Sequence, residues 1–318
     1  MKLSEKGKLY GAAIAFTLSI GFSFFGIKKC VPFADSLTLL TYRYATALVG
    51  VILFVLITRA LGKTPQKRPG RPKGKLYLAA SFYILFMIFQ IAAMYFATSI
   101  EGAIVFAMVP IFAKIIGRLV LGERSTPRQN FFVIITVAAL IVLIILNATD
   151  LTMNVTGLVM MTIGSIFMAC HNVSVRYVRG VFSPIEITAC IATGGSVIFI
   201  AASLIRSIAR GDLWSLIEPL THPQFVIWAS FLGIFCILLS ALFMSYMLAH
   251  MEIVQSTVFS SASTLVSIIA GALILGEPLY WFHYICGALI LAGVIGLTLT
   301  PVDPKNSGRS LADDISEE

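Results

Sequence analysis

Long apolar runs, separated by short polar or glycine- and proline-containing breaks, extend along almost the whole chain. A bilayer core about 30 Å thick needs about 20 apolar residues in a helix that crosses it. By that length the pattern predicts ten membrane-spanning helices, and so an all-α integral membrane fold. The predicted spans are residues 9–27, 36–57, 76–97, 100–121, 129–147, 155–174, 184–205, 224–247, 253–275 and 279–299.

Two of the predicted spans begin with a capping pattern. Ser183 is followed three residues later by Glu186, and Thr126 by Gln129, each with proline directly after the first residue. A capping box with proline at the first helical position is typical of a helix start. Glu186 is therefore interpreted as a helix cap.

The composition agrees with a membrane protein. Of 318 residues, 58% are hydrophobic and 12% are charged, about half the 25% usual in soluble domains. This excludes a soluble enzyme and a nucleic-acid binder and makes the lipid bilayer the expected partner. The five cysteines have neither zinc-type spacing nor the even number of a disulfide framework, so neither a metal nor a cofactor is expected.

Lysine and arginine predict the orientation. With the N-terminus in the cytoplasm, 16 of the 23 cations fall on the cytoplasmic side, four fall outside and three lie within helices. Cytoplasmic loops of membrane proteins carry this excess of positive charge. We therefore expect a multi-pass protein of an inner or plasma membrane with both termini in the cytoplasm.

An internal repeat divides the chain. Residues 117–123 resemble residues 271–277 at an offset of 154, and the region around Gly11 resembles that around Gly157 at an offset of 146. Five helices per repeat is an odd number, so the second copy must enter the membrane inverted, as in many alternating-access carriers. The expected units are two five-helix repeats and a cytoplasmic acidic tail, residues 7–147, 153–300 and 301–318.

A family resemblance follows from these features taken together. Ten spans in two halves, Arg43 followed by an aromatic residue, and Pro110 thirteen residues before Glu123 resemble the EamA family of the drug/metabolite transporter superfamily. The second half differs, because Thr264 stands where that pattern has proline. The resemblance implies a polytopic carrier with a central cavity between the halves, often an exporter of amino acids, other metabolites or drugs.

Lys114 and Arg118 are the first candidates for substrate chemistry. They lie one turn apart in the fourth predicted span, on the same face as Pro110. A cation at that depth costs about 2.5–3.5 kcal/mol unless it faces water or a partner. Lys114 is predicted to bind a carboxylate or phosphate, or else to snorkel or pair structurally. Pro110 and Arg118 are assigned to helix distortion and gating, with snorkelling as the alternative for Arg118.

Arg43 is a further candidate in the second predicted span. It lies between two tyrosines, and its position matches the resembled family, so a role in the fold or in gating competes with substrate binding. A cation–π contact with a tyrosine, or a salt bridge to Asp35 or Glu101, is expected to hold it.

Neutral polar residues complete the predicted substrate site. Gln90 lies in the third span, and His171 and Asn172 lie in the sixth. Ser260 and Ser263 belong to a run of serines at helical spacing in the ninth. Close helix packing is the alternative for the serines, and a bond to a backbone carbonyl is the alternative for His171. The cavity is expected between spans one, three, four, six, eight and nine.

The predicted function is a secondary carrier of small metabolites, especially amino acids or other carboxylate-bearing compounds, with export favoured over import. The alternative is a drug or lipid/polyprenyl-phosphate translocase of the same fold. A membrane-embedded enzyme is disfavoured, since the chain contains no His-Glu-x-x-His, no Gly-x-Ser-x-Gly and no aspartate pair within a span. The expected partners are a small-molecule substrate and lipid, and a homodimer is compatible with the sequence.

Overall fold

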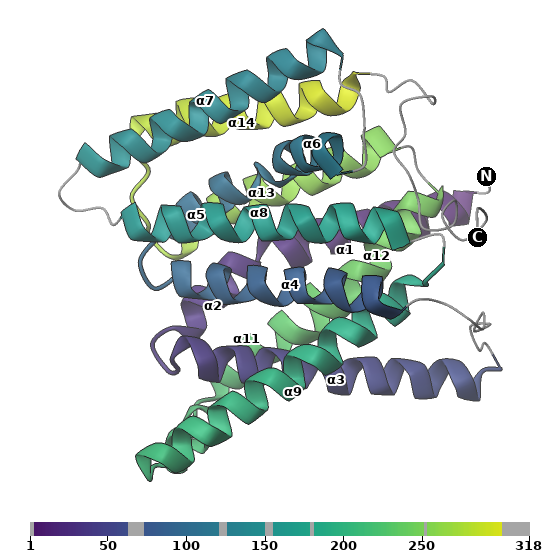
Figure 1. Cartoon of the computed structure of the whole chain (residues 1–318), viewed down its shortest axis with the longest axis vertical. Helices are drawn as coiled ribbons and strands as arrows, with labels where there is room; N and C mark the ends of the chain where they lie inside the picture. The colour runs from purple at the N-terminus through teal and green to yellow at the C-terminus, as the bar shows by residue number, and fades with distance from the viewer. Residues whose placement is uncertain are drawn as a thin grey trace.

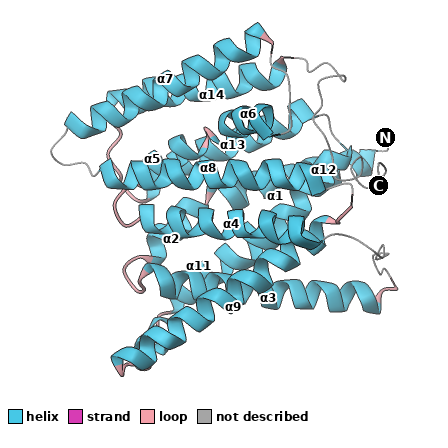
Figure 2. Ribbon diagram, viewed as in Figure 1, coloured by secondary structure: helices cyan, strands magenta, loops and turns pink. Residues whose placement is uncertain are grey.

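The computed structural model of the chain describes residues 3–62, 73–120, 126–149, 155–178, 181–250 and 253–300. Within these ranges the structure is helical and contains no β-strand (Figure 2). Nine of the described helical segments are long and apolar enough to cross a membrane, and Val258–Ile274 is a shorter apolar helix at the ninth predicted position. The predicted all-α membrane fold is confirmed. The predicted acidic tail, residues 301–318, lies outside the described residues.

The helices follow the predicted spans closely. In chain order they are α1 (Leu3–Gly21), α2 (Ser23–Cys30), α3 (Ser36–Ala60), α4 (Lys73–Ala93), α5 (Ser99–Phe106), α6 (Val109–Val120), α7 (Pro127–Thr149), α8 (Val155–Val178), α9 (Pro184–Arg210), α10 (Trp214–Ile217), η1 (Glu218–Thr221), α11 (Pro223–Gly233), η2 (Ile234–Leu239), α12 (Ser240–His250), α13 (Ile253–Ile274) and α14 (Trp281–Leu299).

Three predicted spans are not continuous α-helices. The first is interrupted between α1 and α2, and the eighth contains the π-helical turn η2. The fourth breaks between α5 and α6, where Pro110 has no N–H to donate to the carbonyl of Phe106. Hydropathy detects the length of a span but not such breaks. π-helical turns inside α-helices occur often at functional sites.

The helix starts have the expected caps. The backbone N–H of Ser183 donates to the Glu186 carboxylate at 2.9 Å, and that of Thr126 donates to Gln129 Oε1 at 3.1 Å. Both predicted capping boxes are therefore confirmed. Glu101 forms a third box with Thr98 at the start of α5.

Six spans form two bundles. Bundle A consists of α4, α5–α6 and α8, and bundle B consists of α1–α2, α11–η2–α12 and α13. The remaining spans form two flanking pairs, α3 with α9 and α7 with α14, at opposite edges of the molecule (Figure 1). Each bundle and each pair therefore contains helices from both sequence halves.

The two halves have equivalent, inverted arrangements. Helix α1 begins, and α8 and α14 end, on the same side of the molecule, so the equivalent spans α1 and α8 run in opposite directions (Figure 1). We call this the terminus side and the other the loop side. The α1–α13 packing of bundle B has its counterpart in the packing of α5–α6 against α8 in bundle A. This confirms the inverted five-helix arrangement.

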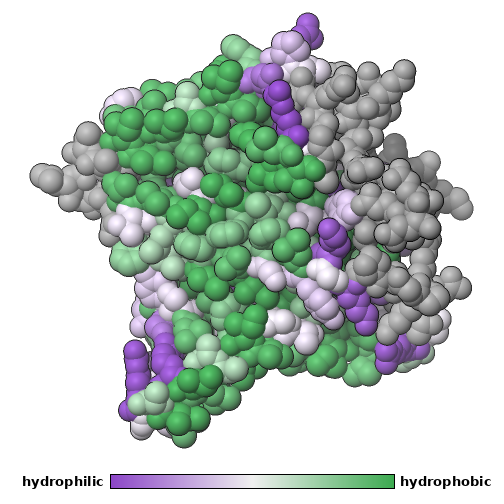
Figure 3. Space-filling model, viewed as in Figure 1, coloured by the Kyte–Doolittle hydropathy of each residue, from purple (hydrophilic) through white to green (hydrophobic). Residues whose placement is uncertain are grey.

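The outer surface is suited to lipid. Hydrophobic side chains cover most of the face in Figure 3. Leu273 of α13 is 81% exposed, and Ile134 of α7 is 67% exposed. Such a large exposed apolar surface is unfavourable in water and favourable in a bilayer.

Candidate functional site

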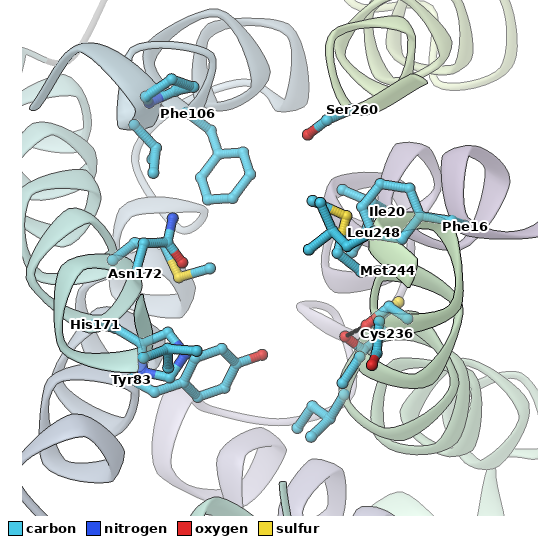
Figure 4. A pocket seen from close by; sticks show the side chains of 18 of the residues that line it. Phe16, Ile20, Tyr83, Phe106, His171, Asn172, Cys236, Met244, Leu248 and Ser260 are labelled. Carbon is cyan, nitrogen blue, oxygen red and sulfur yellow. Dashed lines mark hydrogen bonds between the residues drawn. The ribbon is translucent and has the colours of Figure 1, made fainter. Parts of the chain in front are cut away.

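A cavity of about 600 Å³ lies between bundles A and B. Tyr83, Phe106, His171 and Asn172 line it from bundle A, and Met244 faces them from bundle B (Figure 4). All six spans from which the cavity was expected contribute to its lining. The cavity also extends to helices that were not expected, with Ile191 on α9 and Val294 on α14.

The cavity walls are mainly apolar, with scattered hydroxyl and amide groups. No lysine, arginine, aspartate or glutamate is among the described residues that line it. A compound held here has most of its surface against carbon, with hydrogen bonds at a few points. The polar side chains of the wall are Tyr83, His171, Asn172, Thr188, Ser240, Ser245, Ser260, Ser261 and Thr264.

Equivalent positions of the two repeats face the same cavity. Phe106 and Pro110 of the broken fourth span line it, and so do Ser260 and Thr264 of α13, each 154 residues later. The same surface is therefore apolar in the first repeat and carries hydroxyls in the second. At these two pairs of equivalent positions the two repeats therefore present different chemistry to the cavity, apolar side chains on the broken fourth span and hydroxyls on α13.

Four of the predicted site residues line this cavity: Pro110, His171, Asn172 and Ser260. His171 Nδ1 donates to the backbone carbonyl of Ala79 at 2.8 Å, which fixes the ring orientation. Nε2 is then the nitrogen that accepts a proton or a hydrogen bond. The ring of Tyr83 packs edge-on against His171 at 5.0 Å.

Arg43 lies deeper than the cavity wall. It is only 1% exposed, and its Nε and Nη1 have no hydrogen-bond partner among the described residues. Arg43 is within electrostatic range of Tyr83 and Cys236, both of which line the cavity. An ionised group in such surroundings is costly unless an anion reaches it.

The two carboxylates expected to form a salt bridge with Arg43 bond to other groups. Asp35 instead forms a salt bridge with Arg206 of α9, joining the α3–α9 pair at the loop side. Glu101 accepts hydrogen bonds from the backbone N–H and hydroxyl of Thr98 at 2.8 and 2.9 Å. Glu101 therefore serves the cap of α5, and Asp35 serves the contact between α3 and α9.

Gln90 and Ser263 are also buried but do not line the cavity. Gln90 Oε1 has no hydrogen-bond partner among the described residues. The hydroxyl of Ser263 donates to the carbonyl of Ser260 at 2.6 Å, and that of Ser267 donates to Gly21 at 2.5 Å. The serines of α13 therefore divide between cavity lining and helix packing.

Lys114 and Arg118 lie away from the cavity. They line a separate pocket of about 380 Å³ between α6 and α7, together with Asn130. Lys114 is half-buried there and Arg118 is exposed. The predicted binding of an acidic substrate by Lys114 remains a prediction, now with a different location from the cavity.

Sequence reasoning missed the contribution of the seventh span. Pro184 and Thr188, in the first turns of α9, line the cavity, as does Ser240 directly after η2. Residue type alone could not identify these positions, because hydroxyls in membrane helices serve helix packing as often as they line a cavity. Across the described ranges, no three His, Cys, Asp or Glu side chains gather in a way that could hold a metal ion.

Comparisons with known proteins agree with this architecture. The model of the EamA-like transporter family matches twice, over residues 7–145 and 155–299. The chain is 28% identical to the uncharacterized transporter YcxC of Bacillus subtilis over 90% of this chain and 91% of that protein. It is 26% identical to an uncharacterized transporter of Archaeoglobus fulgidus, over 88% of this chain and 95% of that protein.

A solved crystal structure, titled only as that of a protein, shares the fold. It is 15% identical, with a TM-score of 0.51, and the alignment covers 92% of this chain and 98% of the other. Two family matches spanning nearly the whole chain, on two inverted five-helix repeats around a cavity, establish the membership. The chain belongs to the EamA-like transporter family.

Proposed function

We propose that this transporter is a secondary carrier that exports small carboxylate-bearing metabolites, amino acids among them, by alternating access through the cavity between bundles A and B. The observation that carries this proposal is the position of the cavity. It lies between two bundles that each combine helices of both inverted repeats. Rocking of one such bundle against another is the usual way in which inverted-repeat carriers expose a central site.

The two bundles contact one another at the loop side. Glu277, in the connection between α13 and α14, accepts hydrogen bonds from the backbone N–H of Ser99 at 2.9 Å and from the Ser99 hydroxyl at 2.6 Å. Phe24 of α2 packs edge-on against Phe106 of α5, with 5.8 Å between the ring centroids. These contacts join bundle B to bundle A beyond the cavity.

At the terminus side the cavity reaches the helix ends. Its lining includes Pro184, the first residue of α9, and Leu248, two residues before the end of α12. Contacts at one side and lining residues at the other are typical of a carrier open to a single side. With the termini in the cytoplasm of an inner or plasma membrane, as the charge distribution favours, this is the side from which an exporter loads.

The chemistry of the walls supports an amphipathic substrate. The apolar surface suits a hydrocarbon or aromatic body, and hydroxyls such as that of Ser260 suit a few polar groups. Arg43, whose buried Nε and Nη1 have no hydrogen-bond partner within the described part of the chain and which interacts electrostatically with Tyr83, is the group proposed to attract a carboxylate. For the carboxylate of a substrate to reach Arg43, Tyr83 or a neighbouring side chain must move as the substrate binds.

A drug exporter is the second candidate. It is favoured by the absence of charged side chains among the described residues of the lining. Apolar or cationic compounds fit such walls without any role for Arg43. The two candidates differ in the charge of the ligand that is bound.

A thermal-shift panel tests the proposal. Purified protein in neutral detergent is heated with anionic, zwitterionic and cationic metabolites of matched apolar size. A ligand at 100 times its dissociation constant stabilises the protein by about 2.7 kcal/mol. We expect carboxylates and zwitterions to raise the unfolding temperature. The compounds that do so are then expected to be transported in a counterflow assay with proteoliposomes. Stabilisation by cationic or apolar compounds alone would contradict the proposed substrate and favour the drug exporter.

A further inference from the structure

The pocket between α6 and α7 has a chemistry different from that of the central cavity. Lys114 and Arg118 occupy successive turns of α6, and Asn130 of α7 completes its polar lining. No carboxylate is among the described residues that line it, and it shares no lining residue with the cavity. We propose that this pocket binds the phosphate of an anionic phospholipid.

The surroundings of the pocket indicate a ligand with acyl chains. Leu119, which lines it, is 77% exposed, and Phe131 of α7 is 59% exposed. Ile134, one turn further along α7, is exposed as well. Leu119 therefore belongs both to the pocket lining and to the apolar outer surface, and these exposed residues of α7 adjoin Asn130 and Val133, which line the pocket. A lipid satisfies both the cations and this apolar border, whereas a free phosphate satisfies only the cations.

The depth of the cations also fits a lipid head group. Arg118 is two residues from the end of α6 on the terminus side, and Lys114 lies one turn deeper. A deep lysine is stabilised when its long side chain reaches an anionic group near the interface.

The site has a consequence for the transport cycle. Helix α6 is separated from α5 by the break at Ala107–Met108, and its first residues, Val109 and Pro110, line the central cavity. A lipid held between α6 and α7 would therefore link the cavity-lining helix of bundle A to the flanking α7–α14 pair.

Lipid binding can be measured without any transport assay. The purified, delipidated protein is titrated with phosphatidylglycerol, with phosphatidylcholine of the same acyl chains, and with inorganic phosphate, and bound lipid is counted by native mass spectrometry. The test variant is Lys114→Gln with Arg118→Gln. The control, Arg59→Gln with Lys73→Gln, removes two exposed cations at the terminus ends of α3 and α4.

We expect wild type and control to bind phosphatidylglycerol at least about tenfold more tightly than the test variant, with little binding of phosphatidylcholine. A Lys114→Arg variant should retain the binding, and the test variant should unfold at the wild-type temperature in phosphatidylcholine. Equal phosphatidylglycerol binding by test variant and wild type would overturn the proposal, as would equal affinity for phosphatidylcholine. If inorganic phosphate at the same concentration as the lipid displaced phosphatidylglycerol as effectively as unlabelled phosphatidylglycerol does, the assignment to a lipid would be overturned. None of these results depends on the identity of the transported substrate.

Discussion

The carboxylate of Glu277 caps helix α5 of the other repeat. It accepts hydrogen bonds from the backbone N–H groups of Ser99 and Ile100 at 2.9 and 3.2 Å, and from the Ser99 hydroxyl. The first turn of a helix has N–H groups without intrahelical partners, and a negative charge there is favourable. One side chain of the α13–α14 connection therefore holds bundle B to bundle A at the loop side.

Glu277→Gln should weaken this contact between the two bundles. Hydrogen bonds to a charged group contribute about 1.5–3 kcal/mol each, so we expect the free energy of unfolding to fall by about 2 kcal/mol or more. Thermal unfolding in detergent measures the loss, and Glu218→Gln, at an exposed position of η1, is the control. An unchanged unfolding temperature would show that the cap does not hold the bundles together.

The Asp35–Arg206 salt bridge predicts a loss of stability in acid. Burial raises the pKa of Asp35, but hydrogen bonds from Arg206 and Thr38 outweigh burial and hold that pKa below its ordinary value. The stabilisation is therefore fully present above about pH 4 and is lost as the pH falls through the lowered pKa. Unfolding temperatures between pH 3 and 7 should drop less steeply for Asp35→Asn than for the wild type. Parallel curves would contradict this role.

Replacing Arg43 should separate stability from binding. Arg43→Met removes a buried charge whose Nε and Nη1 find no hydrogen-bond partner among the residues that the structure describes, and such replacements are often neutral or stabilising by about 1–4 kcal/mol. We expect the ligand-free protein to unfold at the same temperature or higher, while stabilisation by carboxylates disappears. Arg210→Met, at the exposed end of α9, should change neither property. A variant that unfolds much earlier would instead make Arg43 structural.

Pro110→Ala tests the proposed gating role of the α5–α6 break. Alanine restores the N–H that proline lacks and favours a continuous helix. We expect slower transport with equal or greater thermal stability, measured by counterflow in proteoliposomes and by thermal unfolding. Faster or unchanged transport would show that flexibility at the break does not limit the cycle.

The spans and their capping were predictable because they depend on local pattern. A run of about 20 apolar residues is a sufficient signal for a span, and the Ser183–Glu186 spacing is sufficient for a cap. The pairing of Asp35 with Arg206 was not predictable, since it joins residues 171 positions apart. The π-helical turn η2 has no proline or charge to mark it. Its position depends on packing that a single sequence does not record.

The candidate site was predictable only in part for a related reason. His171 and Asn172 stand out as polar groups in an apolar span, and both line the cavity. Lys114 stands out as well, but helical spacing alone cannot tell which side of α6 faces the cavity. The structure decides this, because Pro110 lines the cavity whereas Lys114 and Arg118 line the pocket toward α7.

Filling the cavity tests the central claim most directly. Ala241 of α12 lines the cavity, and Ala288 of α14 is exposed on the outer surface. Ala241→Phe and Ala288→Phe add the same ring at these two positions, and ligand affinity is measured by thermal shift with the carboxylates that stabilise the wild type. We predict that Ala241→Phe lowers affinity at least about tenfold while Ala288→Phe retains it, with both variants folded. Equal affinities for the two variants would contradict the assignment of this cavity as the substrate site.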